Sequence, residues 1–537
     1  MSAPNSHVGD PSKRWTMVAD LERCVGCQTC TAACKHANAT SPAVQWRRVL
    51  DIESGTFPDV RRTFVPVGCM HCSDPPCMHV CPSTATGQRA DGIVTIDYDI
   101  CIGCAYCAVA CPYQARYKVQ KPLSAYAGAK MKNEAEREDP ARLGVAQKCT
   151  WCADRIDFGL ENGLTPGVDP RATPACVNAC IADALHFGDA NDPESNVSKL
   201  LAKSHTFKMH AELGTDPNFH YVYGANTLDD PAGTEMARTV DKHADLGVKP
   251  WLQQHWDWRA AGNFIGGGTG GGLAVMGALA AFLGTQSGEL HLAAMVSMAL
   301  GLFMVFLETG RPFRAPLNVF FHPQTSWMTR EAMVGVVFFP VTLAAVWTGM
   351  TELAWASGLL GLAFVYAQAR ILTEAKGIPA WRTRSSLPLI LSTGLTEGAG
   401  LALAAAAAFP VALGGMRETL LWGLLALVIL RALAWIAYRA RLQAGAPEMT
   451  NRVLAAAHPG ILIGGHLIPA GLIIGALLFT EQAAFMAALA GLVAASVGWA
   501  MKFIIVVRAS YNQGFAIERV PSRGGIGIAG GVQPGWQ

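Results

Sequence analysis

Sixteen cysteines, all between Cys24 and Cys180, are the residues of this chain whose type and spacing could do chemistry. They form four groups of four: Cys24, Cys27, Cys30, Cys34; Cys69, Cys72, Cys77, Cys81; Cys101, Cys104, Cys107, Cys111; and Cys149, Cys152, Cys176, Cys180. The first and third groups read C-x2-C-x2-C-x3-C, the run that binds cubane iron–sulfur clusters. A proline follows Cys81 and Cys111, which is a further mark of such runs. The cysteines therefore predict four [4Fe–4S] clusters and one-electron transfer.

Two other uses of cysteine compete with this one. Disulfides need an oxidising compartment, and the N-terminal stretch has neither an apolar signal core nor a twin-arginine pair, so we expect reduced thiols. The fourth group, with its long gap from Cys152 to Cys176, could be a zinc site if it stood alone. Because three other complete groups accompany it, clusters are the better interpretation.

The elements that must position these cysteines occupy only the first half of the chain. Charged residues make up 15% of the 537 residues, and the deficit lies after Arg259, where long apolar stretches alternate with short loops. Eight stretches are long enough to cross a bilayer: about 260–284, 289–308, 331–350, 353–372, 387–412, 418–438, 458–480 and 482–507. We therefore expect an α+β double ferredoxin-like domain followed by an all-α bundle of eight transmembrane helices.

The predicted domains are a four-cluster domain, a docking extension with linker, a membrane anchor and a cytoplasmic tail, at 1–190, 191–258, 259–508 and 509–537. Within the extension, the acidic stretch 225–245 is typical of a linker, and the segment around Glu212–Tyr223 could instead dock a partner.

Positive charge predicts the orientation of the anchor, because Lys and Arg in short loops are retained on the cytoplasmic side. The loops on the side of the N-terminal domain carry Arg311, Arg314, Arg330, Lys376, Arg382, Arg384, Arg439, Arg441, Arg452, Arg508, Arg519 and Arg523. The opposite loops offer only Arg417. We expect a multi-pass protein of the inner (cytoplasmic) membrane with both termini and the cysteine domain in the cytoplasm. The net charge of +2 gives no reason to expect nucleic acid as a partner.

Four segments carry a resemblance to a known family. The cysteine groups, with KCTWCADRI at Lys148–Ile156 and ELGTDPNFHYV at Glu212–Val222, resemble the iron–sulfur subunit of the dimethyl sulfoxide reductase family of molybdenum/tungsten oxidoreductases. The stretches Gly310–Glu331 and Lys502–Gly524 resemble the membrane anchor subunit of that family. The chain is thus similar to a fusion of two subunits. The resemblance implies a separate catalytic subunit with a bis-pterin molybdenum or tungsten centre, and exchange of electrons with menaquinone or ubiquinone.

In such paired cluster domains the fourth thiolate of a run usually crosses to the neighbouring cluster. The predicted ligand sets are then set 1, Cys24, Cys27, Cys30 and Cys180; set 2, Cys34, Cys149, Cys152 and Cys176; set 3, Cys69, Cys72, Cys77 and Cys111; and set 4, Cys81, Cys101, Cys104 and Cys107. Some relatives lack the cysteine at the position of Cys104 and hold a three-iron cluster, so its presence here predicts four irons.

The loop from Glu308 to Glu331 is the candidate quinone site, because it gathers groups that could hydrogen-bond quinone carbonyls and exchange protons. Its candidate residues are Glu308, Arg311, Arg314, His322, Trp327, Arg330 and Glu331. By the resemblance, a histidine of the family's quinol site occupies the position of Glu308, and an acid matches Glu331. The alternative is that the arginines anchor lipid and the glutamates pair with them.

A second polar group lies deeper in the membrane half. Glu397, Arg431 and His466 reach similar depths, on the order of 10–15 Å from the cytoplasmic ends of their helices. Intramembrane charges are costly unless paired, so an ion pair between Glu397 and Arg431 is our hypothesis, with His466 nearby. The alternatives are a quinone contact or a proton path, the latter as in a redox-driven ion-translocating module.

Haem b is the competing cofactor of quinone-linked anchors. Its candidate ligands are His291, His458 and His466, but no two helices offer a pair at matching depth, and we do not expect haem b. The glycine-rich run Gly266–Gly272 lies inside the first predicted span, so we expect it to serve close helix packing and not phosphate binding.

Overall fold

The computed structural model describes residues 9–42, 44–54, 58, 60–122, 124–126, 131–225, 248–285, 287–408, 414–517 and 533–536. The chain forms two compact units: unit 1 is Met1–Trp251 with Asn512–Gln537, and unit 2 is Leu252–Tyr511. The predicted linker 225–245, apart from its first residue, and the tail positions Arg519 and Arg523 lie outside the described residues.

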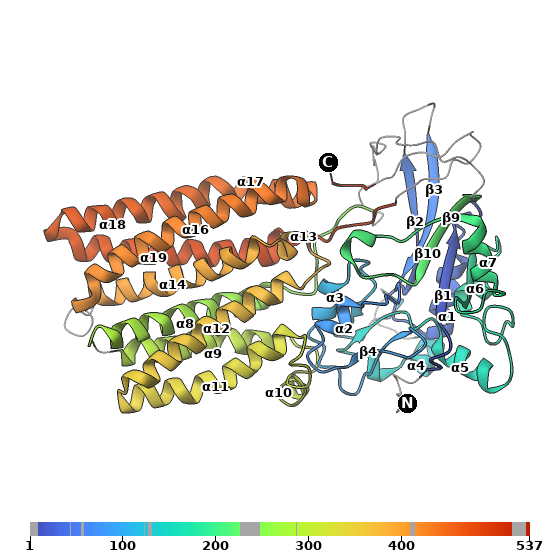
Figure 1. Cartoon of the computed structure of the whole chain (residues 1–537), viewed down its shortest axis with the longest axis horizontal. Coiled ribbons are helices and arrows are strands. Elements are labelled where there is room, and N and C mark those ends of the chain that lie inside the picture. The colour runs from blue at the N-terminus through green and yellow to red at the C-terminus, as the bar shows by residue number, and fades with distance from the viewer. Residues whose placement is uncertain are drawn as a thin grey trace. The chain divides into compact units, whose positions relative to one another are not determined.

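Unit 1 is built on a four-stranded sheet with the order β8-β1-β10-β9, of which β1, β9 and β10 are labelled in Figure 1. Strand β1 pairs in parallel with β10, so that Met17 stands opposite Phe219, and antiparallel with β8. The run WTMVA is buried along its whole length, as expected for a central strand covered on both faces. The strands of the sheet are β1 (Trp15–Asp20), β8 (Leu185–Asp189), β9 (Ser204–Phe207) and β10 (Phe219–Ala225).

Among the described residues, unit 1 also contains three two-stranded ribbons: β2 (Arg47–Ser54) with β3 (Arg61–Gly68), β4 (Thr86–Gln88) with β5 (Val94–Ile96), and β6 (Tyr117–Lys118) with β7 (Ala146–Gln147). Its helices are short: α1 (Thr29–Asn38), α2 (Pro76–His79), α3 (Tyr106–Ala110), α4 (Lys132–Arg137), α5 (Ala153–Glu161), α6 (Ala175–Asn178) and α7 (Asn196–Lys203). This is a ferredoxin-like iron–sulfur fold, as predicted.

The first and third cysteine groups adopt the same local backbone. Gly26 and Gly103 both have φ +71°, a value that glycine adopts without strain. Two residues later Gln28 and Ala105 are also left-handed, with φ of 61° and 59°, and a helix begins at the next residue. The repeated turn therefore presents the third cysteine of each run in the first turn of a helix.

Unit 2 contains eight helical spans long and apolar enough to cross a membrane, among the residues described, which confirms the predicted number. They are α8 (Trp258–Phe282), α9 (Gly288–Glu308), α11 (Trp327–Thr348), α12 (Thr351–Thr373), α14 (Ser386–Ala408), α16 (Arg417–Gly445), Glu448–Leu478 and Ala483–Arg508. The seventh comprises α17 (Glu448–Leu462), a π-helical turn (Ile463–Leu467) and α18 (Ile468–Leu478); the eighth comprises α19 (Ala483–Phe503) and a π-helical turn (Ile504–Arg508). Short helices α10 (Ala315–Asn318) and α13 (Pro379–Arg382) lie in loops. The chain is a multi-pass membrane protein.

Helix α8 is the central helix of unit 2, and its glycines explain why. A Cβ on Gly266 would meet the backbone of α9, on Gly271 the carbonyl of Gly361 in α12, and on Gly272 the carbonyl of Gly394 in α14. Small residues let helix backbones approach closely in membranes. The glycine run therefore serves helix packing, as the sequence predicts.

The chain returns to unit 1 after its last span. Phe515 and Ile517 are buried in the same hydrophobic core as Trp15 and Met17. The carbonyl of Gly514 lies 3.2 Å from Nε2 of His210. The segment that follows the membrane helices is thus part of the iron–sulfur unit.

Candidate functional site

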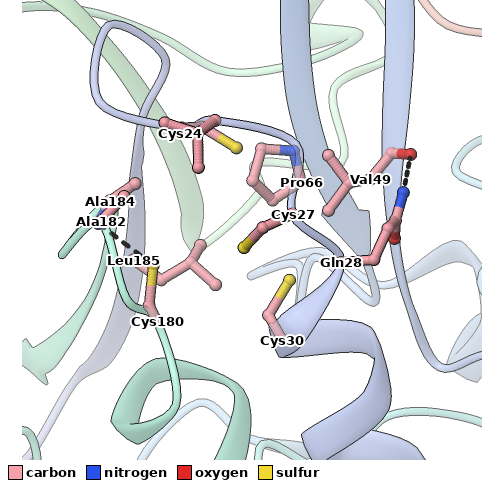
Figure 2. Close-up of a pocket in the computed structure, with 11 residues that line it drawn as sticks. Cys24, Cys27, Gln28, Cys30, Val49, Pro66, Cys180, Ala182, Ala184 and Leu185 are labelled. Atoms are coloured by element: carbon pink, nitrogen blue, oxygen red, sulfur yellow. Dashed lines mark hydrogen bonds between the residues drawn. The ribbon is translucent and has the colours of Figure 1, made fainter.

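Three cysteines from the first run and one from the last line a common pocket (Figure 2). Its lining includes Cys24, Cys27, Cys30 and Cys180, together with apolar residues such as Leu185. In Figure 2 the sulfur atoms of Cys27, Cys30 and Cys180 point into the space between them. The backbone N–H of Ala184 donates to Sγ of Cys180 at 3.2 Å, which holds that sulfur in place. These are the members of set 1.

Electrostatic interactions group the remaining thiols in the same way. Burial is the main cause that raises the pKa of the Cys34, Cys72 and Cys104 thiols, and neighbouring thiols raise each pKa further. The neighbours are Cys149, Cys176 and Cys152 for Cys34; Cys69, Cys77 and Cys111 for Cys72; and Cys107, Cys81 and Cys101 for Cys104. These neighbourhoods have the membership of sets 2, 3 and 4.

The chemistry of the donors suits iron held at separate corners of a cluster. Burial raises the pKa of Cys107, Cys111 and Cys149 to about 12, so these thiols need a metal charge to become thiolates at neutral pH. Within the described ranges, no three His, Cys, Asp or Glu side chains come close enough to hold one metal ion together. A zinc site gathers its ligands around a single ion, whereas a cubane takes one thiolate at each iron. The thiols therefore fit iron–sulfur clusters.

Several donors approach the cysteine sulfurs. Backbone N–H groups of Trp151 and Thr86 donate to Cys149 at 3.4 Å and Cys81 at 3.5 Å. The guanidinium of Arg116 donates to Sγ of Cys77 at 2.9 Å. Such hydrogen bonds stabilise negative charge on sulfur and are one of the means by which proteins set cluster potentials.

The candidate quinone residues divide into two kinds in unit 2. Glu308 and Glu331 are buried, whereas Arg311, Arg314, His322, Trp327 and Arg330 are partly exposed. Glu308 accepts a hydrogen bond from the backbone N–H of Asp257 at 3.1 Å. Arg330 stacks on Trp327 and donates to two backbone carbonyls of its own loop, so it stabilises the loop.

Glu331 belongs to a buried polar cluster whose other members were not predicted. Nδ2 of Asn263 in α8 donates to Oε1 of Glu331 at 3.4 Å, and Nε2 of Gln368 in α12 donates to the carbonyl of Asn263 at 2.9 Å. The side-chain oxygens of Asn263 and Gln368 have no hydrogen-bond partner among the described residues. An amide inside an apolar helix is a signal visible in the sequence.

The hypothesis of a Glu397–Arg431 ion pair is wrong in its partner. Glu397 pairs with Lys502, with Nζ 2.7 Å from Oε2, and both side chains are buried. The prediction from depth is right in one respect, since Arg431 lies beside Glu397. Both side chains face Gly498: a Cβ added there would lie 2.8 Å from Oε1 of Glu397 and 3.2 Å from Nη1 of Arg431. Arg431 itself donates to the carbonyls of two other residues, so rotation about the helix axis decides which cation bonds the carboxylate.

Hydrogen bonds surround this buried pair. Thr269, from the glycine run of α8, donates to Oε2 of Glu397 at 2.9 Å, and Nε1 of Trp499 donates to the Thr269 hydroxyl. Lys502 also donates to the carbonyl of Phe264 at 2.9 Å. Two π-helical turns, at Ile463–Leu467 and Ile504–Arg508, interrupt the neighbouring spans. Turns of this kind are frequent at functional sites.

The three candidate haem histidines have separate surroundings. Nδ1 of His291 lies 3.2 Å from the hydroxyl of Ser357, and Nδ1 of His458 accepts from Nε1 of Trp435. His466 uses Nδ1 toward the carbonyl of Ile461 within the π-helical turn. Each histidine therefore has a local partner at Nδ1, while Nε2 of His291 and of His466 has none among the described residues.

Comparison with known proteins adds a family to this geometry. Residues 60–137 match the model of a 4Fe-4S dicluster domain. The chain is 42% identical over 221 residues to the B subunit of a selenate reductase of Mesobacillus selenatarsenatis, a match that covers 39% of this chain and 72% of that protein. It is 34% identical to the iron–sulfur subunit of an arsenate respiratory reductase of Shewanella sp. over 40% of this chain and 99% of that protein. It is 35% identical to the B subunit of a polysulfide reductase of Wolinella succinogenes over 39% of this chain and 95% of that protein.

These relatives are named as iron–sulfur or B subunits of reductases, and the matches cover most of their length but only about two-fifths of this chain. The dicluster match falls within the cysteine-bearing part of unit 1. The chain therefore belongs to the family of electron-transferring iron–sulfur B subunits of oxidoreductase complexes, and carries in addition an eight-helix membrane unit.

Proposed function

We propose that this chain is the electron-transfer and membrane-anchor subunit of a quinone-linked molybdenum or tungsten bis-pterin oxidoreductase. Sets 1 to 4 would each hold one [4Fe–4S] cluster, and each cluster, when bound, would accept and release one electron. The observation that carries this proposal is the grouping of the cysteine thiols into the four neighbourhoods described above.

The four sets are consecutive neighbours, which supports a single path for electrons. Electrostatic interactions join Cys30 of set 1 to Cys176 of set 2. They also join Cys149 of set 2 to Cys69 of set 3. Set 4 is joined to set 3 through Cys107 and Cys77. Each set is thus adjacent to the next in the order 1, 2, 3, 4.

Set 1 is the proposed end of the electron path that faces the catalytic partner. Cys27 is the exposed cysteine of this set. Beside its pocket, Val25 and Ile181 are 47% and 73% exposed, which is unusual for large apolar side chains next to a cofactor site. Docking of a separate catalytic subunit would cover them and exclude water from the cluster.

The proposed quinone site lies in unit 2 around Glu331. A carboxyl group next to two amides can bind a quinone carbonyl and exchange a proton with it. The buried cluster of Glu331, Asn263 and Gln368 offers a carboxyl group for a quinone carbonyl, and its amide oxygens, which have no partner among the described residues, could accept hydrogen bonds from the hydroxyl groups of a quinol. Glu308 would be a second proton carrier. Menaquinone and ubiquinone both present the required carbonyls.

We further propose the cytoplasmic membrane as the location, with unit 1 on the cytoplasmic side. The distribution of Lys and Arg among the loops supports this orientation. The return of residues 512–517 to the core of unit 1 supports placing both ends of the chain on one side.

Anaerobic purification of the complex in detergent tests the proposal. We expect about sixteen irons and as many sulfides per chain, Mössbauer spectra of [4Fe–4S] clusters, and a co-purifying subunit with a pterin cofactor. Cys180→Ser should remove or convert one cluster and leave the signals of the others. Zinc in place of iron, or about eight irons in a protein that transfers electrons from quinol, would contradict the four-cluster assignment.

An ion-translocating module is the second candidate, and the buried Glu397–Lys502 pair beside two π-helical turns favours it. The discriminating variant is Glu397→Gln. If quinone turnover continues while proton uptake by proteoliposomes stops, the membrane unit moves protons. If both activities continue, the pair is structural.

A further inference from the structure

Three cations are buried in unit 1 without a carboxylate partner in the described part of the chain. Arg47, Arg116 and Lys148 are no more than 3% exposed, and none of them forms an ion pair with an Asp or Glu there. A buried arginine elsewhere in the unit is different: Arg89 bonds the carboxylates of Asp91 and Asp157. Burying an unpaired charge is expensive, so the counter-charge of the three cations must come from another source.

Arg116 connects set 3 with set 4. Its Nη2 donates to Sγ of Cys77, a member of set 3, at 2.9 Å. Its Nη1 donates to the hydroxyl of Thr86 at 2.9 Å, and the backbone N–H of Thr86 donates to Sγ of Cys81 in set 4. The guanidinium therefore reaches both sets through hydrogen bonds.

Lys148 connects set 2 with set 3. Its ammonium donates to the carbonyls of Cys149, in set 2, at 2.6 Å and of Val94. His71, which stands between two cysteines of set 3 in the sequence, uses the same two residues: its Nε2 lies 3.1 Å from the carbonyl of Cys149, and its Nδ1 accepts from the N–H of Val94.

Arg47 is buried and interacts electrostatically with thiols of sets 1 and 2, although it donates no hydrogen bond to a cysteine sulfur in the described part of the chain. Its Nη2 donates to Sδ of Met17 at 2.9 Å, and its Nε and Nη1 have no hydrogen-bond partner among the described residues. Burial lowers the pKa of Arg47, but the charges of four thiols outweigh burial and raise it. These thiols are Cys176, Cys149, Cys30 and Cys34, from sets 1 and 2.

We propose that Arg47, Lys148 and Arg116 are potential-setting cations, one in each interval between adjacent clusters, and that each raises the reduction potentials of the two clusters beside it. The proposal rests on the proposed function, in which sets 1 to 4 hold clusters. Each electron adds one negative charge to a cluster, so a fixed positive charge nearby favours the reduced state. A cation between two clusters also lessens the repulsion between them when both are reduced.

Redox titration of the full-length complex, followed by electron paramagnetic resonance, tests the proposal. Each neutral variant, Arg47→Gln, Lys148→Gln or Arg116→Gln, should lower two of the four midpoint potentials. At a fixed ambient potential the ratio of reduced to oxidised cluster should fall about tenfold, equal to about 59 mV for a one-electron couple. Because the intervals overlap, the double variant at 47 and 148 should move three potentials, and the double variant at 47 and 116 all four.

Matched variants separate charge from structure. Arg47→Lys, Arg116→Lys and Lys148→Arg keep the charge and should keep the potentials. Lys199→Gln removes an exposed cation and should change no potential. Iron content is measured in parallel, since an unsubstituted chain that binds fewer than about sixteen irons contradicts the proposed function and not this inference.

Unchanged potentials in neutral variants that keep all their iron would overturn the inference. If glutamine at a position prevents cluster assembly, methionine is the second neutral variant. A position at which neither neutral variant keeps its iron, while the charge-keeping variant does, has a structural role and is removed from the set.

Discussion

Replacing Glu397 by glutamine should destabilise the membrane unit more than replacing Lys502 by methionine. In the Glu397→Gln variant, Lys502 and Arg431 lose the anion that lies between them, so two buried cations remain unpaired. Removing one partner of a buried ion pair costs about 3–5 kcal/mol. In the Lys502→Met variant, Glu397 still faces the guanidinium of Arg431, and the loss should be closer to that of one charged hydrogen bond, about 1.5–3 kcal/mol.

The double variant makes the reasoning quantitative. With both charges removed, Arg431 keeps its bonds to the carbonyls of Ala494 and Gly465, so the double variant should be no less stable than Glu397→Gln alone. The coupling energy between the two sites should then exceed about 1.5 kcal/mol, the lower bound for a charged hydrogen bond. Ordinary side-chain hydrogen bonds in membrane proteins average about 0.6 kcal/mol in such cycles, so the value distinguishes an ion pair from a hydrogen bond.

Equilibrium unfolding of the purified full-length chain in mixed detergent micelles, followed by far-UV circular dichroism, measures these energies. Ser496→Ala is the control. Ser496 lies on α19, the helix of Lys502, but it is exposed and its hydroxyl bonds the carbonyl of Leu492 one turn away. Additive single-variant effects, or Lys502→Met as the more damaging change, would refute the arrangement of one anion between two cations.

Three further predictions concern other parts of the chain. Gly272→Ala should lower the stability of unit 2 by about 1–3 kcal/mol, because the added Cβ would overlap the carbonyl oxygen of Gly394 in α14. In the control variant Gly288→Ala the added Cβ meets nothing within 4 Å, so thermal unfolding should show no change in stability. Glu331→Gln should slow quinol oxidation more than about tenfold at unchanged iron content, and the exposed Glu352→Gln should not. Burial, with a smaller contribution from a nearby lysine, lowers the pKa of His220 to about 4. The free energy of unfolding of unit 1 should therefore fall by about 1–3 kcal/mol as the pH falls from about 6.5, where the unfolded chain begins to take up the proton, to about 4. The His220→Gln variant should lose less stability over the same pH series.

The sequence predicted elements best where one physical signal dominates. Apolar length alone identified all eight spans, but the seventh begins at Glu448, about one-third of the span earlier than hydropathy indicates. Its first turns carry Glu448, Asn451 and Arg452, which are polar although helical, and a hydropathy window cannot separate them from a loop. The repeated turn at Gly26 and Gly103 follows from cysteine spacing and glycine, so it was within reach of the sequence.

The polar contacts between helices and strands could not be predicted from the sequence. Counting about 1.5 Å per residue placed Glu397 and Arg431 at one depth, yet the rotation of each helix decides that Lys502 from α19 makes the bond. Arg47 opens strand β2 and Arg116 follows a cysteine run, so neither position marks them as buried cations. The partners of such residues depend on packing between segments far apart in the chain, for which periodicity and composition carry no signal.

The course of the C-terminal segment constrains the topology of the membrane unit independently of charge. The chain leaves unit 1 after Trp251 and re-enters it at Asn512, and Phe515 and Ile517 are buried in the core that contains strand β1. A chain that leaves and re-enters one folded unit must cross a membrane an even number of times between the two points. Eight spans satisfy this condition, and an odd number would not. Packing in unit 1 thus supports the same arrangement of ends that the arginines and lysines of the loops predict.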